Sequence, residues 1–267
     1  KTRKGKMKQS SQKAVAILGG VGPYAGLIIH KHILDLNSKF TPIQCDQDYV
    51  NIIHYSFSSQ IQDRTSFLLK KITTNPGLGA AQLMLEINET AARQDRKVFA
   101  ITPCNTFHAP PIFGAMEEEL AKHKMENLEV FNLVKCTVGH IRESYPNAKK
   151  IGLMSTSGTR EFRIYHDYLE PLGFEVVQVD EDLQDELHDT IYNQEWGIKV
   201  KGKTDKSVNN FKKYAEQLKQ KGAETMILGC TEIPMVLDEG SYEGIPLIDP
   251  MEAAARSVLA ALYGDQQ

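Results

Sequence analysis

The sequence predicts an α/β fold composed of two similar halves, each built on a parallel β-sheet. The first observation is an alternation along the chain: short apolar runs that end in small residues are separated by longer segments with helical spacing of apolar residues. The second observation is that a Gly-rich turn followed by a Cys-containing turn occurs twice, in the same order. Together these features indicate a duplicated arrangement of strands and helices.

The apolar runs predict the strands, and the longer segments predict the helices. Strands are expected at Ala14–Leu18, Val50–Tyr55, Val98–Thr102, Lys150–Met154, Glu175–Val179 and Thr225–Leu228. Helices are expected at Ala25–Leu36, Gly79–Arg93, Phe162–Pro171 and Val208–Gln220. Polar surface loops or helix ends are expected at Pro42–Tyr49 and Lys122–Glu129. Near-continuous apolar strands of this kind are typical of parallel sheets that are covered on both faces.

The internal repeat predicts the domain organisation. Ala14–Gly22 and Lys150–Gly158 are each a strand that runs into a Gly-containing turn, whereas Val98–Thr106 and Met226–Glu232 are each a strand that ends at a Cys. We therefore expect two Rossmann-like domains related by pseudo-twofold symmetry. The expected boundaries are a disordered tail at 1–13, a first domain at 14–132 plus 246–267, and a second domain at 133–245.

Composition restricts the class of protein. The 267 residues are 41% hydrophobic and 24% charged, with a net charge of −3, which argues against nucleic acid as the main partner. No apolar run reaches the roughly 18–20 residues that span a bilayer, and no apolar segment follows the basic N-terminus as in a signal peptide. Four cysteines without a C-x-x-C pair fit neither a zinc site nor a disulfide framework. We expect a cytoplasmic protein that binds no membrane.

Two of the cysteines are candidates for chemistry. Cys104 and Cys230 follow predicted strands, and ligands of parallel α/β sheets gather at the carboxyl ends of strands. A helix is expected after each, whose N-terminus would lower the thiol pKa. Polar residues that need partners when desolvated cluster beside them: Thr102, Asn105, Thr106, Thr231 and Glu232. A structural role as a small buried side chain, which we expect for Cys45 and Cys136, stays open for both on spacing alone.

Two thiols in a duplicated fold suit one reaction in particular. Inversion of a stereocentre requires one group to remove the α-proton and a second group to deliver a proton from the opposite side. The carbanion also requires donors that are aimed at the substrate carboxylate before the reaction begins.

Seven short motifs, spread over about residues 14–255, resemble the aspartate/glutamate racemase family, and within it the aspartate racemase branch. The most specific are Thr102–Thr106 (TPCNT) and Leu228–Pro234 (LGCTEIP), and the others are Ile17–Pro23 (ILGGVGP), Asp63–Thr65 (DRT), Asn75-Pro76, Gly158-Thr159 and Ile198-Lys199. The resemblance implies two α/β domains with the active site in the cleft. It also implies racemisation of a small acidic amino acid, no pyridoxal phosphate or other cofactor, no metal, and a homodimer.

The resemblance also implies roles for individual residues. Cys104 and Cys230 would be the two acid/base groups. The α-carboxylate would be bound by Asn105, Thr106 and Thr231, with help from the turn that contains Gly20 and Gly22. The side-chain carboxylate would be held by Arg64 and Lys199, and the Gly158-Thr159 motif would bring Thr159 to the substrate. An Arg fork and a Lys point charge both suit a carboxylate.

Three positions depart from the family pattern. Phe107 stands where the family has a smaller residue, next to a matching His108, and Phe162 and Arg163 also replace small residues. These departures leave the size and charge of the pocket, and so the choice between aspartate, glutamate and another amino acid, undecided.

Other readings remain open. Isomerases of unsaturated diacids and decarboxylases of substituted malonates resemble the same superfamily, and a non-catalytic relative would keep the fold without turnover. A nucleotide-binding protein is disfavoured, because the Gly19–Gly22 turn lacks the full G-x-G-x-x-G spacing and a correctly placed acidic residue.

Overall fold

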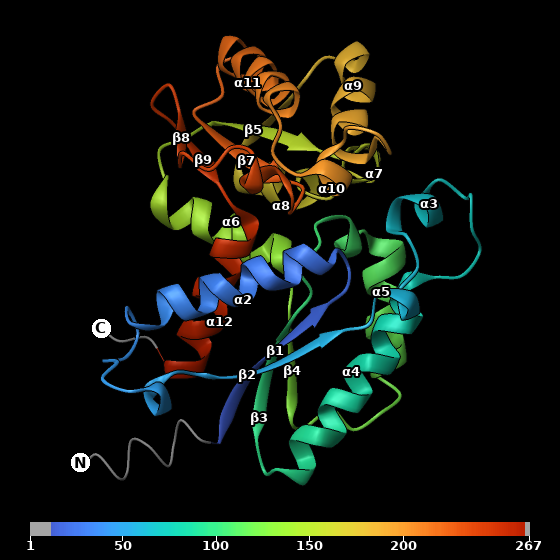
Figure 1. The fold of residues 1–267 in the computed structure, drawn as a ribbon, viewed down its shortest axis with the longest axis vertical. Helices are drawn as coiled ribbons and strands as arrows, with labels where there is room; N and C mark the ends of the chain where they lie inside the picture. Colours follow the sequence, from blue (N-terminus) through green and yellow to red (C-terminus); the bar gives the residue numbers. More distant parts are fainter. Residues whose placement is uncertain (1–11, 265–267) are drawn as a thin grey trace. The chain divides into compact units, whose positions relative to one another are not determined.

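The computed structural model describes residues 12–264 and forms two compact units (Figure 1). The first unit ends at Leu133 and resumes at Met251, whereas the second unit runs from Val134 to Pro250. Both units are α/β, as the sequence predicts. In the described part of the chain, no helix is both long and apolar enough to cross a membrane.

The first unit is built on a four-stranded parallel sheet. Its strands are β1 (Lys13–Gly19), β2 (Asn51–Ser56), β3 (Lys97–Ile101) and β4 (Leu128–Phe131), and their order is β2-β1-β3-β4. The side chains of β1 are almost entirely buried, which explains why its sequence is an uninterrupted apolar run.

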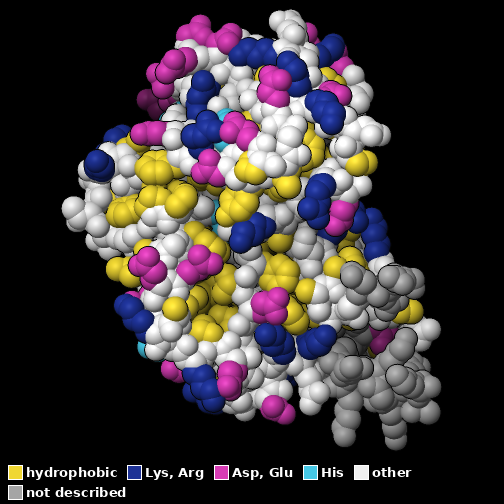
Figure 2. Space-filling model, turned by 180° about the vertical axis from the view of Figure 1, so that it is seen from behind, with side chains coloured by type: hydrophobic (Ala, Val, Ile, Leu, Met, Phe, Trp, Pro, Cys, Tyr) yellow, Lys and Arg dark blue, Asp and Glu magenta, His cyan; other side chains and the backbone are white. Residues whose placement is uncertain are grey.

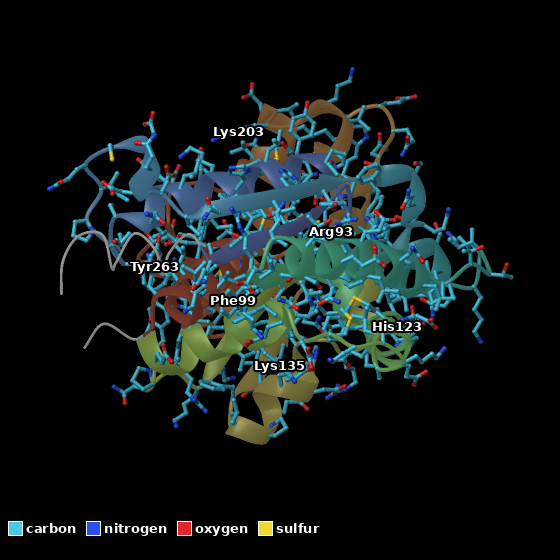
Figure 3. The ribbon with its side chains drawn as sticks, turned by 90° about the horizontal axis from the view of Figure 1, so that it is seen from below. Arg93, Phe99, His123, Lys135, Lys203 and Tyr263 are labelled. Atoms are coloured by element: carbon cyan, nitrogen blue, oxygen red, sulfur yellow. The ribbon has the colours of Figure 1, made fainter. Side chains whose placement is uncertain are left out.

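Helices cover both faces of this sheet. They are α2 (Pro23–Asn37), α4 (Pro76–Arg93), α5 (Pro110–Leu120) and α12 (Pro250–Tyr263), and a further short helix, α3 (Arg64–Leu68), lies between β2 and α4 in the chain. In Figure 1, α2 and α12 lie on one face, and α4 and α5 lie on the other. Tyr263, labelled in Figure 3, donates a hydrogen bond to Asn37 Oδ1 at 3.0 Å and so joins the ends of α12 and α2.

The second unit contains a five-stranded sheet. Its strands are β5 (Lys150–Ser155), β6 (Glu175–Gln178), β7 (Thr225–Gly229), β8 (Ser241–Tyr242) and β9 (Ile245–Ile248), in the order β6-β5-β7-β9-β8. Only β8, a short edge strand that pairs with β9, is antiparallel among the described strands. In Figure 1, α9 (Glu181–Tyr192) and α11 (Asp205–Gln220) cover one face of this sheet, and α6 (Leu133–Ser144) and α8 (His166–Leu169) cover the other.

The two sheets have the same topology. If the parallel strands of each unit are counted along the chain, both sheets have the order second, first, third, fourth. This shared order agrees with the internal repeat seen in the sequence. It also makes β3 and β7 equivalent, and these are the strands that precede Cys104 and Cys230.

The surface carries charges of both signs. Figure 2 shows one face on which Lys and Arg side chains are interspersed with Asp and Glu and with small apolar areas. Most ion pairs of the described residues are between exposed side chains, such as Lys203 with Asp238 at 3.0 Å, and contribute little to stability.

Some sequence-based boundaries need correction. Phe162–Pro171 is not one helix, because Arg163 has a left-handed backbone (φ 48°) and Pro171 falls in a 3-10 turn after α8. The expected loop at Lys122–Glu129 contains the first residues of β4.

The domain limits also differ from the expected ones. The boundary expected between residues 245 and 246 would cut β9, which pairs with β7 and so lies in the second unit. Of the tail expected at 1–13, residues 1–11 lie outside the described residues, whereas Lys13 already pairs with Lys97 in the first sheet.

Candidate active site

In the first unit, the Gly-rich turn and the Cys104 turn lie at the same edge of the sheet. Strands β1 and β3 are parallel neighbours with Ile17 opposite Ile101, so both turns leave the sheet at its carboxyl edge. Strand β2 ends at the same edge, because Gly19 is opposite Ser56. This edge is where parallel α/β sheets bind ligands.

Gly20 is required by the geometry of the first turn. Its φ is +78°, a conformation that L side chains rarely adopt. A Cβ at this position would also lie 2.8 Å from the backbone nitrogen of Ser58 and 2.9 Å from that of Phe57. Gly22, with φ 82°, is the N-cap of α2. The turn therefore brings bare backbone to the edge of the sheet, as a site for a carboxylate requires.

Cys104 lies in a buried turn after β3. Cys104 is 8% exposed, and its backbone N–H donates to Thr102 O at 2.9 Å. Asn105 and Thr106 follow it and are also buried, at the start of the 3-10 helix η3 (Thr106–His108). The hydroxyl of Thr102 is buried with no hydrogen-bond partner among residues 12–264, which is typical of a group that awaits a ligand.

His108 fixes this turn. Its Nδ1 is 2.8 Å from Cys104 O, and its Nε2 accepts a hydrogen bond from the backbone N–H of Leu133 at 3.1 Å. The ring is therefore neutral, with its proton on Nδ1. Burial lowers the pKa of His108 to about 4, against the raising effect of the hydrogen bond to Cys104. His108 thus has a structural role in holding the backbone of the Cys104 turn.

Arg64 approaches the Cys104 turn from a separate helix. It is the first residue of α3, which contacts η3, and it is only 8% exposed. Asp63 caps α3 by accepting from Ser66 N at 2.7 Å, and Arg64 Nη1 donates to Gln62 O at 3.2 Å. The next side chain, Thr65, has a buried hydroxyl that lacks a partner in the described part of the chain. In the first unit, the structure therefore brings Arg64 to the same edge as Cys104.

The second unit repeats the arrangement. Strands β5 and β7 are parallel neighbours with Ser155 opposite Gly229, so the turn after β5 and the Cys230 turn share one edge. Thr156 caps α7 (Ser157–Glu161) by accepting from Thr159 N at 3.3 Å, and it donates to Thr159 Oγ1 at 3.2 Å. Thr159 is fully buried and therefore supports the turn; its contact with substrate stays a prediction.

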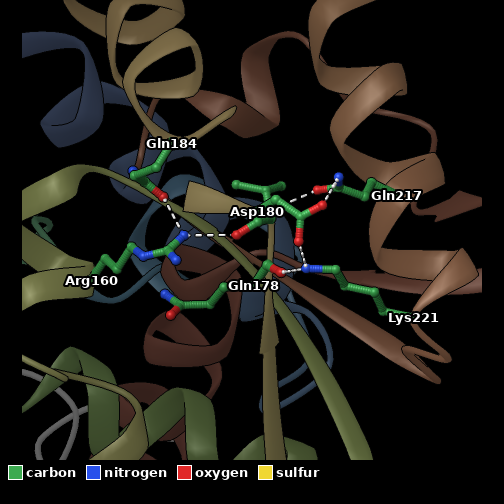
Figure 4. A network of polar contacts seen from close by, with 7 residues as sticks. Arg160, Gln178, Asp180, Gln184, Gln217 and Lys221 are labelled. Carbon is green, nitrogen blue, oxygen red and sulfur yellow. Dashed lines mark hydrogen bonds and ion pairs between the residues drawn. The ribbon is translucent and has the colours of Figure 1, made fainter. Parts of the chain in front are cut away.

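A polar network fixes the loops beside this edge (Figure 4). Arg160 donates to Val179 O at 2.8 Å and to Gln184 Oε1 at 3.2 Å, and Gln184 donates to Ser155 O at 3.0 Å. Lys221 donates to Gln178 O at 2.8 Å. These bonds connect the ends of β5 and β6 with α9 and α11, and they hold the backbone that frames the turn.

Cys230 belongs to a buried cluster of polar side chains. Its Sγ donates to Glu232 Oε2 at 3.0 Å, and Thr231 Oγ1 donates to the same oxygen at 3.2 Å. The other carboxylate oxygen, Oε1, accepts from Lys199 of α10 (Ile198–Lys201). The ammonium group of Lys199 also lies 5.2 Å from the ring centre of Tyr192, so an aromatic ring and a carboxylate share one cation.

The charges in this cluster are coupled. Burial raises the pKa of Cys230 well above its ordinary value, Glu232 raises it further, and Lys199 opposes the rise. Burial would raise the pKa of Glu232, but Lys199 and the hydrogen bonds that the carboxylate accepts lower it on balance. Burial likewise acts against the charge of Lys199, yet the Glu232 carboxylate keeps the Lys199 pKa above its ordinary value. The pair is therefore ionised, and Cys230 is a thiol.

This result corrects the expectation that a helix N-terminus lowers the pKa of Cys230. The element that follows is not an α-helix but a three-residue 3-10 turn, Ile233–Met235. Such a turn has almost no dipole, so desolvation and the neighbouring carboxylate decide the pKa. After Cys104, α5 begins only at Pro110, beyond η3.

Two of the departures from the family pattern, Phe107 and Arg163, have side chains in the core and at the surface, respectively. Phe107 is fully buried, and its ring meets those of His108 and Phe113 edge-on, at centroid distances of 5.7 and 6.2 Å. Arg163 is exposed and pairs with Glu170 at 2.5 Å. Phe107 therefore fills space in the core, and the charge of Arg163 is paired with that of Glu170 at the surface.

Sequence reasoning missed most of the support around Cys230. The sequence indicates Glu232 only as a polar neighbour of Cys230 and gives no signal for Tyr192 and His188, whose rings stack at 4.8 Å. The signal for Glu232 is its place two residues after a Cys that ends a buried strand. Among residues 12–264, no group of three or more His, Cys, Asp or Glu side chains could hold a metal ion.

Comparison with known proteins gives the family. Residues 18–258 match the family described as Asp/Glu/Hydantoin racemase. A glutamate racemase of Caldanaerobacter subterraneus subsp. tengcongensis is 30% identical over 173 residues, which are 62% of this chain and 55% of that protein. The matched region thus spans about half the length of that relative.

Solved structures share the fold. The aspartate racemase of Picrophilus torridus superposes with a TM-score of 0.74 at 22% identity, covering 94% of each chain. The glutamate racemase of Francisella tularensis subsp. tularensis SCHU S4, solved in complex with D-glutamate, gives a TM-score of 0.61 at 17% identity, covering 96% of this chain and 83% of that one. Because the family match extends over most of the sequence and includes both Cys turns, the chain belongs to the Asp/Glu/Hydantoin racemase family.

Proposed function

We propose that this racemase acts on a small acidic amino acid, aspartate in the first place and glutamate in the second, and uses Cys104 and Cys230 as its two acid/base groups. The observation that carries the proposal is the equivalent position of the two thiols. Each is buried in the turn after the third strand of a sheet with the same strand order. A duplicated fold with one thiol in each half supplies two groups of the same kind for two opposite faces of one carbon.

The proposed reaction is a direct proton exchange. One cysteine, as thiolate, takes the α-proton; the C–H bond breaks, and its electron pair is delocalised into the carboxylate. The other cysteine, as thiol, gives its proton to the opposite face of the carbon, and a new C–H bond forms. The two cysteines exchange protonation states in each turnover, so no redox partner or cofactor is consumed.

Donors in each unit support the binding of a substrate with two carboxylates. In the first unit, the backbone of the Gly20–Gly22 turn with Asn105 and Thr106 would bind the α-carboxylate, and Arg64 the side-chain carboxylate. In the second unit, Lys199 would hold the side-chain carboxylate, and Thr231 would bind the α-carboxylate once its hydroxyl turns away from Glu232, to which it donates in this structure. Lys199 has three donor hydrogens, so it can hold Glu232 and a substrate oxygen together.

Two further expectations belong to this proposal. Cytoplasmic location is expected because buried free thiols must stay reduced to act as acid and base. A homodimer is expected from the family, and the exposed apolar side chains Tyr24, Leu27 and Leu34 of α2 are compatible with one. Light scattering of the purified protein would give the oligomeric state.

The test is racemisation by the purified protein without added cofactor. L-aspartate, L-glutamate and a panel of other L-amino acids would be incubated separately, and chiral chromatography would follow the D-enantiomer. We expect D-aspartate or D-glutamate to form, and we expect Cys104→Ser and Cys230→Ser each to lower the rate by about 10²–10⁴-fold.

Cys45→Ser is the matched control, because Cys45 is exposed, not buried as expected from the sequence, and its loss should leave the rate unchanged. Full activity in the Cys104→Ser, Cys230→Ser double variant would refute the proposed mechanism. Turnover of an unsaturated diacid or a substituted malonate without racemisation would instead favour another reaction on the same fold.

A further inference from the structure

The strongest unassigned feature is the carboxylate of Glu232. It is 5% exposed, and both of its oxygens accept hydrogen bonds from side chains of the second unit. One oxygen accepts from Cys230 Sγ at 3.0 Å and from Thr231 Oγ1 at 3.2 Å, and the other accepts from Lys199. No role in the family resemblance explains why a buried carboxylate should touch a reactive thiol.

We infer that Glu232 is a positioning residue that holds Cys230 in its thiol form, with its S–H bond fixed in direction, and that Lys199 serves as the counter-ion of Glu232. The inference rests on the proposed function, because it assigns Cys230 the part of proton donor in the resting enzyme.

The geometry supports the thiol form directly. A carboxylate with two neighbouring cationic or hydroxyl donors stays ionised, and an ionised carboxylate can only accept hydrogen bonds. The 3.0 Å contact with Cys230 therefore requires a hydrogen on sulfur. A thiolate in the same place would put two buried negative charges in contact, which is the least favourable arrangement of this pair.

Lys199 makes the arrangement tolerable in a buried site. An isolated buried carboxylate is costly, and a cation in hydrogen-bond contact removes most of that cost. Lys199 is held from its other side by the ring of Tyr192, which is itself stacked on His188. Burial raises the pKa of Cys230 most, and among the described residues the charged groups that act on this pKa are Glu232, which raises it further, and Lys199, which lowers it.

The arrangement has a consequence for turnover. When Cys230 gives its proton to the substrate carbon, the S–H bond breaks and a thiolate remains beside Glu232. The ammonium group of Lys199 attracts both negative charges and so limits the free-energy cost of this state. Cys230 then regains a proton, either from solvent or from the α-carbon of the opposite enantiomer, and the negative charge of Glu232 favours this return to the resting form.

The test titrates the thiol itself, so it does not depend on turnover. Cys230 would be alkylated with iodoacetamide over a range of pH, and its modification followed by peptide-resolved mass spectrometry in the wild type and in Glu232→Gln. Loss of the carboxylate should lower the pKa of Cys230 by about one to three pH units, since a like charge in contact has an effect of that size.

Glu186→Gln is the matched control. Glu186 is also a lysine-paired glutamate of the second unit, and its carboxylate accepts from Lys213 at 2.8 Å and from Tyr214 at 3.1 Å rather than from a thiol. Its replacement should leave the titration of Cys230 unchanged. A Glu232→Gln protein that folds and titrates at Cys230 like the wild type overturns the inference.

A second variant decides the matter if Glu232→Gln does not fold. In Lys199→Met the cation that lowers the pKa of Cys230 is lost, so this pKa should rise above the wild-type value. An unchanged or lower pKa in Lys199→Met contradicts the inference. Because the two variants are expected to move the pKa in opposite directions, a general loosening of the fold cannot imitate both results.

Activity provides a separate readout. The equilibrium constant between free enantiomers is one, so both directions must share one pH profile of kcat/KM, which reports the pKa values of the free enzyme. In Glu232→Gln its basic limb should move to lower pH for both enantiomers. A profile that keeps its position and only falls in height would assign Glu232 a purely structural part and overturn the inference.

Discussion

The buried His108 makes the stability of the first unit depend on pH. It is neutral in the folded chain because its Nε2 accepts the N–H of Leu133 and its Nδ1–H donates to Cys104 O. A second proton on Nε2 would face that N–H and break the bond. Its pKa is about 4 when folded, against an ordinary value of 6.5.

The sign and size of the effect follow from linkage. Below pH 6.5 the unfolded chain binds a proton at His108 that the folded chain refuses until pH approaches 4. The stabilisation is therefore complete above pH 6.5 and is lost as the pH falls towards 4. A difference of about 2.5 pH units corresponds to about 3 kcal/mol at about 1.4 kcal/mol per unit.

The assay is urea-induced unfolding at pH 7 and at pH 4.5, followed by circular dichroism. His108→Gln can still accept the N–H of Leu133 but does not titrate, so it should lose less stability than the wild type over this range. His123→Gln, which changes an exposed histidine (labelled in Figure 3), should behave like the wild type. Equal losses in the wild type and in His108→Gln would refute this account of the Cys104 turn.

Three further predictions test other parts of the structure. Gly20→Ala should destabilise the protein by more than about 1 kcal/mol and impair activity, because the positive φ and the 2.8 Å approach to Ser58 N both oppose a Cβ; thermal unfolding and racemisation assays check this. Phe107→Ala should cost about 3–5 kcal/mol of stability, measured by chemical unfolding, because it empties a fully buried ring position; a loss below about 1 kcal/mol would mean that the ring is not part of the core. Dialysis against EDTA, or addition of pyridoxal phosphate, should leave the racemisation rate unchanged, and a large change in either case would contradict the cofactor-independent mechanism.

Much of the fold could be predicted from the sequence because buried parallel strands are uninterrupted apolar runs. Each of the six expected strands coincides with an observed strand within one or two residues. β4 was missed because its four residues include the exposed Glu129 at a sheet edge, and β9 because Pro246 interrupts it. Phe162–Pro171 had helical spacing, but backbone conformation at Arg163 is decided by tertiary packing that periodicity does not report.

Only part of the candidate site could be predicted from the sequence. The thiols stand out because each ends an apolar run, whereas their partners come from distant segments. Lys199 lies 33 residues before Glu232 in the chain, and only folding brings α10 to the turn after β7. Leu133 lies 25 residues after His108, and the donor is its backbone N–H, which no sequence motif can indicate. Contacts of this kind explain why the pKa of Cys230 was expected to fall when burial and a carboxylate raise it.

The central claim is that Cys104 and Cys230 act on opposite faces of one carbon, and isotope placement tests it most directly. L-aspartate, or whichever L-amino acid proves to be the substrate, would be incubated in heavy water, and proton NMR with chiral separation would locate deuterium in the first few per cent of turnover. The two-thiol mechanism predicts deuterium at Cα of the newly formed D-enantiomer and protium in the remaining L-enantiomer, because the group that removes the proton does not deliver the new one. Rapid deuteration of the recovered L-enantiomer would mean that a single group removes and returns the proton on one face, and would contradict the account.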